Sequence, residues 1–241
     1  MEEREDKKIV RVTDNHSVKK TGRSFQIVEA YKTLRTNLLF TLATTDQKIV
    51  VITSPQPHAG KSTTSTNLSI VMAQSNFKVL LIDADMRKPS LDRSFRVGRT
   101  DGLSRVLSGM STFEETVVRQ VVPNLDLLVA GPIPPNQQEL LGSQKMKELL
   151  EEASQQYDYI FIDTPPVNVV ADALMVLDES VGMLLVVREG ETTHEELRAA
   201  EEAVGQVGGN LLGVLLTNVR PRKGLRREKY YKSSSYEYSE K

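Results

Sequence analysis

Residues 48–67 constrain the fold more than any other part of this chain, and their sequence is KIVVITSPQPHAGKSTTSTN. The β-branched apolar run at residues 49–53 predicts a buried strand that ends at Ser54 and the prolines after it. The loop then reaches Gly60-Lys61-Ser62-Thr63, and apolar residues follow at helical spacing. A strand, such a loop and a helix are the context of a phosphate-binding loop, in which backbone N–H groups surround an anion at the positive end of a helix.

The loop matches the second half of the pattern G-x-x-x-x-G-K-[ST], because Pro55 stands at the position of the first glycine. Proline carries no N–H, so we expect the backbone donors at Ala59, Gly60, Lys61, Ser62 and Thr63. Lys61 should reach the outer phosphates, and the Ser62 hydroxyl should bind Mg²⁺. A Gly-Lys-Ser triplet alone could also be an exposed helix N-terminus, but the preceding strand and the following helix favour the phosphate loop.

Length and composition predict one globular domain with a sizeable core, since the chain has 241 residues and 39% of them are hydrophobic. The lack of Cys excludes disulfides and thiol catalysis and is typical of a reducing compartment. No apolar run approaches the roughly 18 residues that span a bilayer, and no signal peptide opens the chain, so we expect a cytoplasmic protein. The three His are far apart, which argues against a zinc site: His16, His58 and His194.

Three aspartates follow predicted strands. Asp83 and Asp85 end the apolar run at residues 79–82, and Asp163 ends the run that begins at Tyr159. In a parallel α/β sheet, ligands bind outside the carboxyl ends of the strands. Together with the phosphate loop, these carboxylates predict a Mg²⁺ site and a general base. The basic segment at residues 86–100 is expected to be a mobile loop near this site, and its cations are Arg87, Lys88, Arg93, Arg96 and Arg99.

The remaining patterns alternate between strand and helix. Helices are expected at residues 25–42, 102–109, 112–118, 143–154, 170–177 and 193–207, with a further one capped at Asn136, and strands at 125–129, 182–187 and 211–217. This alternation predicts an α/β fold with a mostly parallel sheet covered by helices on both faces. Residues 1–24 should form a flexible arm with a short strand possible at 9–12, residues 25–219 the phosphate-loop domain, and residues 220–241 a separate tail.

Two further features are open to more than one interpretation. The first predicted helix carries charged residues three positions apart: Glu29, Lys32 and Arg35. They could form an ordinary solvated charge ladder or an interface with another subunit. The tail at residues 220–241 has eight Lys or Arg and three Asp or Glu, and it contains four tyrosines: Tyr230, Tyr231, Tyr236 and Tyr238. Such a tail could bind nucleic acid or accept phosphoryl groups. The eleven residues from Val219 to Tyr230 span roughly 35–40 Å when extended, enough to reach a neighbouring subunit's site.

These residues resemble a known family. The chain is similar to bacterial tyrosine kinases (BY-kinases) of the capsule and exopolysaccharide type, in the cytosolic form of Gram-positive bacteria. The resemblance covers residue 29 to the C-terminus and rests on the tyrosine cluster and five blocks: EAYKTLRTNL (29–38), SPQPHAGKSTT (54–64), VLLIDADMRKP (79–89), GPIPPNQQELL (131–141) and YIFIDTPP (159–166). It implies a P-loop NTPase fold like that of MinD and ParA, unrelated to eukaryotic protein kinases.

The resemblance also implies roles for single residues. Residues 60–63 would bind the phosphates of ATP, and Asp83 and Asp163 would act on Mg²⁺ together with Ser62. Asp85 would take the proton from the attacking tyrosine, which makes Asp85, Lys61 and Asp83 the catalytic set. The four tail tyrosines would be phosphorylated in trans. Glu29 and Arg35 match a ladder that closes a ring of subunits, whereas Lys32 stands where arginine is usual and cannot make the same bidentate contact.

The resemblance implies partners as well. A separate transmembrane protein would activate the kinase and hold it at the membrane, a tyrosine phosphatase would oppose it, and other proteins would be substrates; no specific nucleic acid is expected. His58 departs from the family, because small residues are usual at this loop position. If the position requires a positive φ, histidine is strained there.

Two other classes of protein remain possible. One is an ATP-driven switch like MinD or ParA, which usually carries an additional lysine early in the loop; Gln56 and its neighbours offer none. The other is a non-catalytic adaptor that only binds ATP, which would not need a base among its aspartates.

Overall fold

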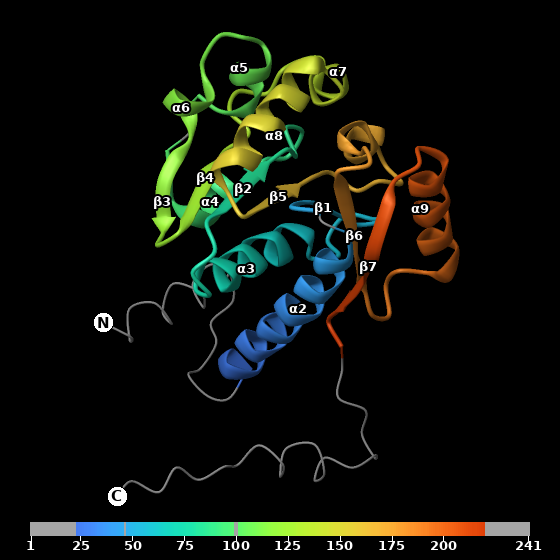
Figure 1. Cartoon of the computed structure of the whole chain (residues 1–241). Helices are drawn as coiled ribbons and strands as arrows, with labels where there is room; N and C mark the ends of the chain where they lie inside the picture. The colour runs from blue at the N-terminus through green and yellow to red at the C-terminus, as the bar shows by residue number, and fades with distance from the viewer. Residues whose placement is uncertain (1–22, 46, 99–100, 220–241) are drawn as a thin grey trace, which may run out of the picture.

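The computed structural model describes residues 23–45, 47–98 and 101–219, and within them a seven-stranded sheet forms the centre of the molecule (Figure 1). The strand order is β3-β4-β2-β5-β1-β6-β7. β3 pairs antiparallel with β4, and the other pairings are parallel. The strands are β1 Ile49–Thr53, β2 Val79–Asp83, β3 Val118–Val122, β4 Leu125–Leu128, β5 Tyr159–Asp163, β6 Val181–Arg188 and β7 Asn210–Thr217.

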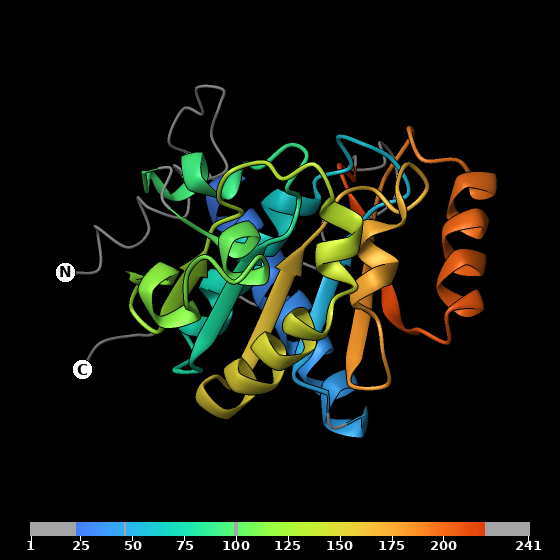
Figure 2. The same ribbon diagram turned by 90° about the horizontal axis from the view of Figure 1, so that it is seen from above.

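Helices cover both faces of this sheet (Figures 1 and 2). One hydrophobic cluster joins one face to α2 Arg23–Thr45, α3 Lys61–Ala73 and α4 Leu91–Phe95. A second cluster joins the opposite face to α5 Leu103–Leu107, α6 Phe113–Thr116, α7 Gln137–Leu141, α8 Gln144–Gln156, the 3₁₀ helix η1 Ala171–Val176 and α9 His194–Gln206. The predicted α/β architecture is therefore confirmed.

The central strands are buried on both faces, which explains their continuous apolar sequences. In β1, Val50 and Ile52 contribute to the cluster beneath α2 and α3, whereas Ile49 and Val51 contribute to the opposite one. The register places Asp83 of β2 beside Asp163 of β5. Since β1 lies next to β5 and leads into the phosphate loop, the sheet brings the predicted aspartates and this loop to one edge.

Helix α2 extends the predicted helix by two residues at its start and three at its end. Leu38 and Leu42 are buried against the sheet, and the rest of the predicted apolar face is partly buried against the same cluster: Val28, Tyr31 and Leu34. None of the described helices combines the length and apolar character of a membrane-spanning segment.

Two local predictions were wrong, and a third was refined. The segment after Asp85 is not loop throughout, because it contains α4, whose first residue Leu91 is fully buried. Val118, expected to end a helix, begins the edge strand β3. The helix expected at 170–177 is present as the 3₁₀ helix η1. The possible strand at 9–12 and almost all of the predicted arm and tail lie outside the described residues.

Candidate active site

The phosphate loop connects β1 to α3 and ends in a conformation that suits glycine. Gly60 precedes the helix with a φ of 98°, a value that residues with a Cβ rarely adopt. The first N–H groups of α3 have no acceptor within the helix, so they are available to an anion. At the other edge of the loop, the Thr217 hydroxyl at the end of β7 donates to the backbone oxygen of Ala59 at 2.7 Å. The loop is thus fixed by a distant strand.

His58 has a φ of 65°, so this loop position does require the left-handed conformation. Its backbone oxygen accepts a hydrogen bond from Arg188 Nη1 at 3.3 Å. Arg188 ends β6, and it also pairs with Glu191 at 2.8 Å. The strained residue is therefore held by a contact that does not involve its imidazole.

Asp83 is fully buried and its carboxylate accepts three backbone hydrogen bonds. Oδ2 accepts from the N–H groups of Ser90 at 3.1 Å and Leu91 at 3.0 Å, and Oδ1 accepts from Asp85 at 3.2 Å. The residues that follow β2 are therefore anchored to Asp83. Burial, followed by the negative charge of Asp163, raises the pKa of Asp83 to about 7.

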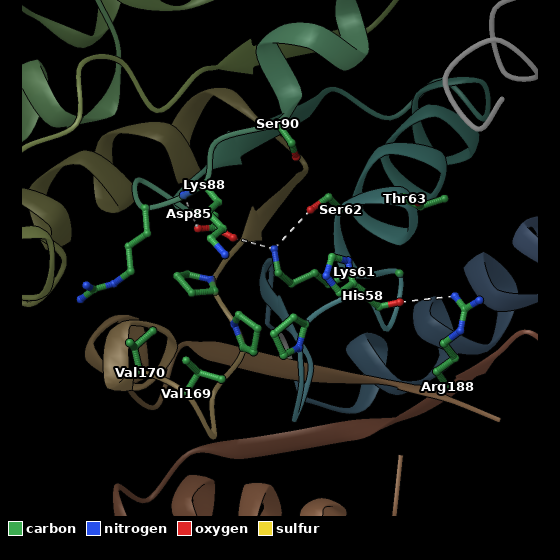
Figure 3. Close-up of a pocket in the computed structure, with 15 residues that line it drawn as sticks. His58, Lys61, Ser62, Thr63, Asp85, Lys88, Ser90, Val169, Val170 and Arg188 are labelled. Atoms are coloured by element: carbon green, nitrogen blue, oxygen red, sulfur yellow. Dashed lines mark hydrogen bonds and ion pairs between the residues drawn. The ribbon is translucent and has the colours of Figure 1, made fainter. Parts of the chain in front are cut away.

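Lys61 links the phosphate loop to two of the aspartates. Its Nζ donates to Asp85 Oδ2 at 2.8 Å (Figure 3). The same Nζ lies 3.9 Å from Asp163 Oδ2. It also donates to Ser62 Oγ at 3.3 Å. Burial acts to lower the pKa of Lys61, but the charges of Asp163 and Asp85 more than offset it, so that the pKa is raised. Lys61 is therefore a protonated cation at the centre of the site.

Asp163 is fully buried and only partly satisfied. Oδ1 accepts a hydrogen bond from Ser65 at 3.0 Å, whereas Oδ2 has no hydrogen-bond partner. Burial raises the pKa of Asp163, even though Lys61 and Ser62 oppose this shift. A buried carboxylate oxygen that accepts no hydrogen bond and lies 3.9 Å from Lys61 Nζ is a suitable ligand for a hard cation.

The donor set fits a cation that is shared with phosphates. No group of three or more His, Cys, Asp or Glu in the described part of the chain is arranged to hold a metal by itself. Mg²⁺ commonly binds through one or two carboxylates, a hydroxyl, waters and substrate phosphates. Asp83, Asp163 and Ser62 match that requirement.

A cavity of about 820 Å³ opens at the phosphate loop, and Ser62 and Asp85 are among its lining residues (Figure 3). One part of its lining is polar and contains Lys61, Ser62, Thr63 and Asp85, and another part is formed by apolar residues: Pro165, Pro166, Val169 and Val170. Its size lies in the range of small-molecule sites. The polar part suits phosphates, and the apolar part suits a flat ring.

The structure brings most of the predicted site residues together, but not all of them. The phosphate loop, Asp83, Asp85 and Asp163 meet at one edge of the sheet. The ladder residues lie on α2: Lys32 pairs with Glu29 at 2.8 Å on the surface, whereas Arg35 turns inward and donates to Val71 O at 3.2 Å. The four tail tyrosines lie outside the described residues.

Several contacts at the site were missed by sequence reasoning. Ser65 is four residues after Lys61 on α3, and this helical spacing could have indicated that it faces Asp163. Thr217 ends a predicted strand at the ligand-binding edge, which could have suggested its contact with the loop. The pair of Arg87 with buried Asp172 joins segments 85 residues apart, and no local signal points to it.

Comparisons with known proteins extend this description. The family model described as AAA domain matches residues 33–193. The tyrosine-protein kinase YwqD of Bacillus subtilis (strain 168) is 44% identical over 195 residues, which cover 81% of this chain and 82% of the relative. The kinase domain of Escherichia coli tyrosine kinase ETK has 36% sequence identity and a TM-score of 0.75, and the match covers 82% of this chain and 79% of that one.

A likeness in fold alone extends further. The septum site-determining protein MinD from Pyrococcus horikoshii OT3, solved with Mg-ADP, has 22% sequence identity and a TM-score of 0.60, and the match covers 70% of each chain. The predicted similarity to the MinD fold is confirmed.

Proposed function

The chain belongs to the bacterial tyrosine-kinase family and is a protein-tyrosine kinase, and we propose that it transfers the γ-phosphoryl group of Mg·ATP to the tyrosines of its own C-terminal segment. The observation that carries this proposal is the contact of Lys61 with Asp85 at 2.8 Å inside the cavity. This contact supports the proposal, because Asp85 would accept the proton and Lys61 would contact the outer phosphates.

Family membership implies nucleotide binding with a metal, and the proposal specifies Mg²⁺. Asp83, Asp163 and Ser62 would hold the ion, which neutralises phosphate charge when bound. The N–H groups of the loop at residues 59–63 would surround the phosphates, and the helix α3 would add its positive end. These residues position the phosphates and stabilise charge, which is most of what phosphoryl transfer requires.

The acceptor hydroxyl must lose a proton. A tyrosine with a pKa near 10 is neutral at physiological pH, so a nearby carboxylate is needed to accept the proton as the bond to phosphorus forms. Asp85 lines the cavity and is fixed by the N–H of Lys88, which donates to Oδ1 at 3.0 Å. When Lys61 contacts the phosphates instead of Asp85, the carboxylate becomes free to accept the tyrosine proton.

The acceptors and partners are part of the same proposal. Tyr230, Tyr231, Tyr236 and Tyr238 would be phosphorylated in trans within a subunit ring, and Glu29, Lys32 and Arg35 would contribute to its interface. A transmembrane protein would activate the kinase and keep it at the cytoplasmic side of the membrane. A tyrosine phosphatase would reverse the modification, and the cycle would regulate capsule or exopolysaccharide synthesis. The resemblance to the family supports these points.

Intact mass after incubation with Mg·ATP tests the proposal. We expect steps of about 80 Da, one per phosphoryl group, that map to the four tail tyrosines. Asp85→Asn should lose them while it still binds ATP. Asp178→Asn is the matched control, because it makes the same change at an exposed carboxylate that does not line the cavity.

The alternative is an ATPase switch of the MinD type, which the shared fold keeps open. Turnover of ATP to ADP without added mass would favour that switch and refute the kinase assignment of the tail.

A further inference from the structure

Four Lys and Arg side chains line the cavity, and three of them contact a carboxylate of the chain: Lys61 with Asp85 at 2.8 Å, Arg87 with Asp172 at 2.9 Å, and Arg188 with Glu191 at 2.8 Å. The fourth is Lys88. Its ammonium group forms no hydrogen bond or ion pair with any residue that the structure describes. The cavity therefore presents one cation whose charge is not neutralised within the described chain.

The backbone fixes Lys88 beside the expected proton acceptor. Its N–H donates to Asp85 Oδ1 at 3.0 Å and lies 3.2 Å from the backbone oxygen of Asp85. This turn places the side chain next to Asp85, where it is exposed and lines the cavity (Figure 3). An anion that approaches Asp85 from solvent therefore meets Lys88.

The nucleotide does not need this cation as its main partner. In the proposed function, Lys61, the N–H groups of the phosphate loop and the metal ligands would contact the phosphates from α3 and the sheet. Lys88 comes from the segment after β2 and lies in the cavity lining beside Asp85, the proposed proton acceptor. We propose that Lys88 is a specificity-determining residue that selects acceptor tyrosines with a negative charge close by in the sequence. This inference rests on the proposed kinase function.

The tail offers two kinds of acceptor that this cation would distinguish. Tyr230 and Tyr231 stand between Lys229 and Lys232, whereas Tyr236 and Tyr238 flank Glu237. Lys88 attracts the second pair and repels the first. A phosphate on Tyr236 or Tyr238 adds a charge of about −1.5 to −2 two residues from the other, which strengthens the attraction for the second transfer. The tail would therefore be phosphorylated first at the acidic pair.

The size of the preference follows from the exposure of Lys88. Exposed ion pairs change equilibrium constants by roughly 1.4-fold to fivefold, and the charge of a phosphate contributes more. We expect kcat/KM to be about twofold to fivefold higher for an acidic acceptor than for a lysine-flanked one, which is the effect of a single exposed ion pair. Reversal of the charge at residue 88 should change that ratio by about tenfold, because it replaces an attraction with a repulsion.

Competition between two acceptor peptides tests this inference. The enzyme is the full chain with its four tail tyrosines changed to phenylalanine, and the peptides are residues 226–234 and 233–241. The ratio of their kcat/KM values is measured in one reaction by mass spectrometry. We expect the peptide 233–241 to be preferred, Lys88→Glu to invert the preference and Lys88→Arg to keep it. Arg93→Glu is the control, because Arg93 is close in sequence but does not line the cavity.

Binding of labelled peptides, measured by fluorescence anisotropy, gives a readout that needs no catalysis. Lys88→Glu should weaken the binding of the peptide 233–241. The binding of the peptide 226–234 should stay unchanged or become tighter. An unchanged ratio in both assays would refute the inference, and a large rise in the KM for ATP without a change in the ratio would make Lys88 a phosphate ligand instead. Selective binding without transfer to either peptide would count against the kinase proposal rather than against Lys88.

Discussion

The guanidinium group of Arg35 donates a hydrogen bond from Nη1 to the backbone oxygen of Val71 at 3.2 Å. Val71 lies in the last turn of α3, and the same Nη1 also donates to the Ser75 hydroxyl just beyond that helix. Arg35 therefore ties α2 to the end of α3 opposite the phosphate loop. A residue that was expected at a subunit interface also contributes to the fold of its own subunit.

Arg35→Ala should lower the free energy of unfolding by about 1–3 kcal/mol, because it removes partly buried hydrogen bonds made by a charged group. For a chain of this size, this corresponds to a fall in Tm of roughly 2–4 °C per kcal/mol. Lys32→Ala should change the stability by no more than about 0.5 kcal/mol, since its pair with Glu29 is exposed. Thermal unfolding of both variants checks this, and equal effects would contradict it.

Stability should depend on pH through Asp83. Its pKa is about 7 in the folded chain and about 4 when unfolded, so the folded state binds more protons between these values. The free energy of unfolding should therefore fall as pH rises from about 4 to 7, by up to about 1.4 kcal/mol per pH unit, and level off above 7. Urea unfolding between pH 5 and 8 with a chelator measures this slope.

Asp83→Asn should reduce the slope without abolishing it, because neighbouring Asp163 also has a raised pKa. Asp178→Asn makes the same change at an exposed carboxylate and is the control. In the proposed function Mg²⁺ would compete with the proton on Asp83, so stabilisation by Mg·ATP should be stronger at pH 8 than at pH 6. A flat profile in the wild-type chain would show that Asp83 is ionised throughout this range.

His58→Gly should stabilise the chain. A non-glycine residue with a φ of 65° destabilises the folded state by about 1–2 kcal/mol. Glycine removes this strain, but it loses more conformational entropy on folding, which offsets about 0.5–1 kcal/mol of the gain. The expected net gain is about 0.5–1 kcal/mol. ATP binding should persist, because Arg188 contacts only the backbone oxygen of residue 58.

Asn76→Gly is the matched control for this experiment. Asn76 has the same φ of 65°, but asparagine tolerates the left-handed region. Denaturant midpoints should therefore rise for His58→Gly and stay within error for Asn76→Gly. If the midpoint rose equally in both variants, relief of strain at His58 would not explain the gain in stability.

Arg87→Ala should destabilise the chain by about 2–3 kcal/mol, because it leaves the fully buried Asp172 without a counter-charge. The native contact is bidentate, with Nε–Oδ2 at 2.9 Å and Nη2–Oδ1 at 3.0 Å. Arg87→Lys should lower the free energy of unfolding by less. The double variant Arg87→Ala with Asp172→Asn should recover part of the stability that Arg87→Ala loses. Arg93→Ala, at an arginine whose side chain is 74% exposed, should have little effect in the same unfolding measurement.

Local sequence patterns were sufficient to predict the central strands of the sheet. The limits of β1 and β5 agree with the predicted strands, because short β-branched and aromatic runs that are buried on both faces have a strong local signal. The positions of Asp83 and Asp163 followed from the rule that ligands gather at the carboxyl ends of parallel strands. For these elements, local pattern and tertiary environment agree.

Other elements depend on contacts that no local pattern encodes. β3 is an edge strand with exposed Arg119 and Gln120 and an irregular register, so it lacks the apolar run of a buried strand. The polar segment after Asp85 contains α4 because the N–H groups of Ser90 and Leu91 bind the Asp83 carboxylate. The inward turn of Arg35 likewise depends on the packing of α2 against α3.

The contact of Thr217 with Ala59 has a consequence for the acceptor segment. Residue 220 follows only three positions after a residue that is bonded to the phosphate loop. A short flexible linker attached at this point would give its own tyrosines an effective concentration on the order of millimolar at the phosphate loop. A neighbouring molecule in dilute solution cannot match that value. Transfer between subunits therefore requires an assembly that presents a neighbour's tyrosines at a higher local concentration than the chain presents its own.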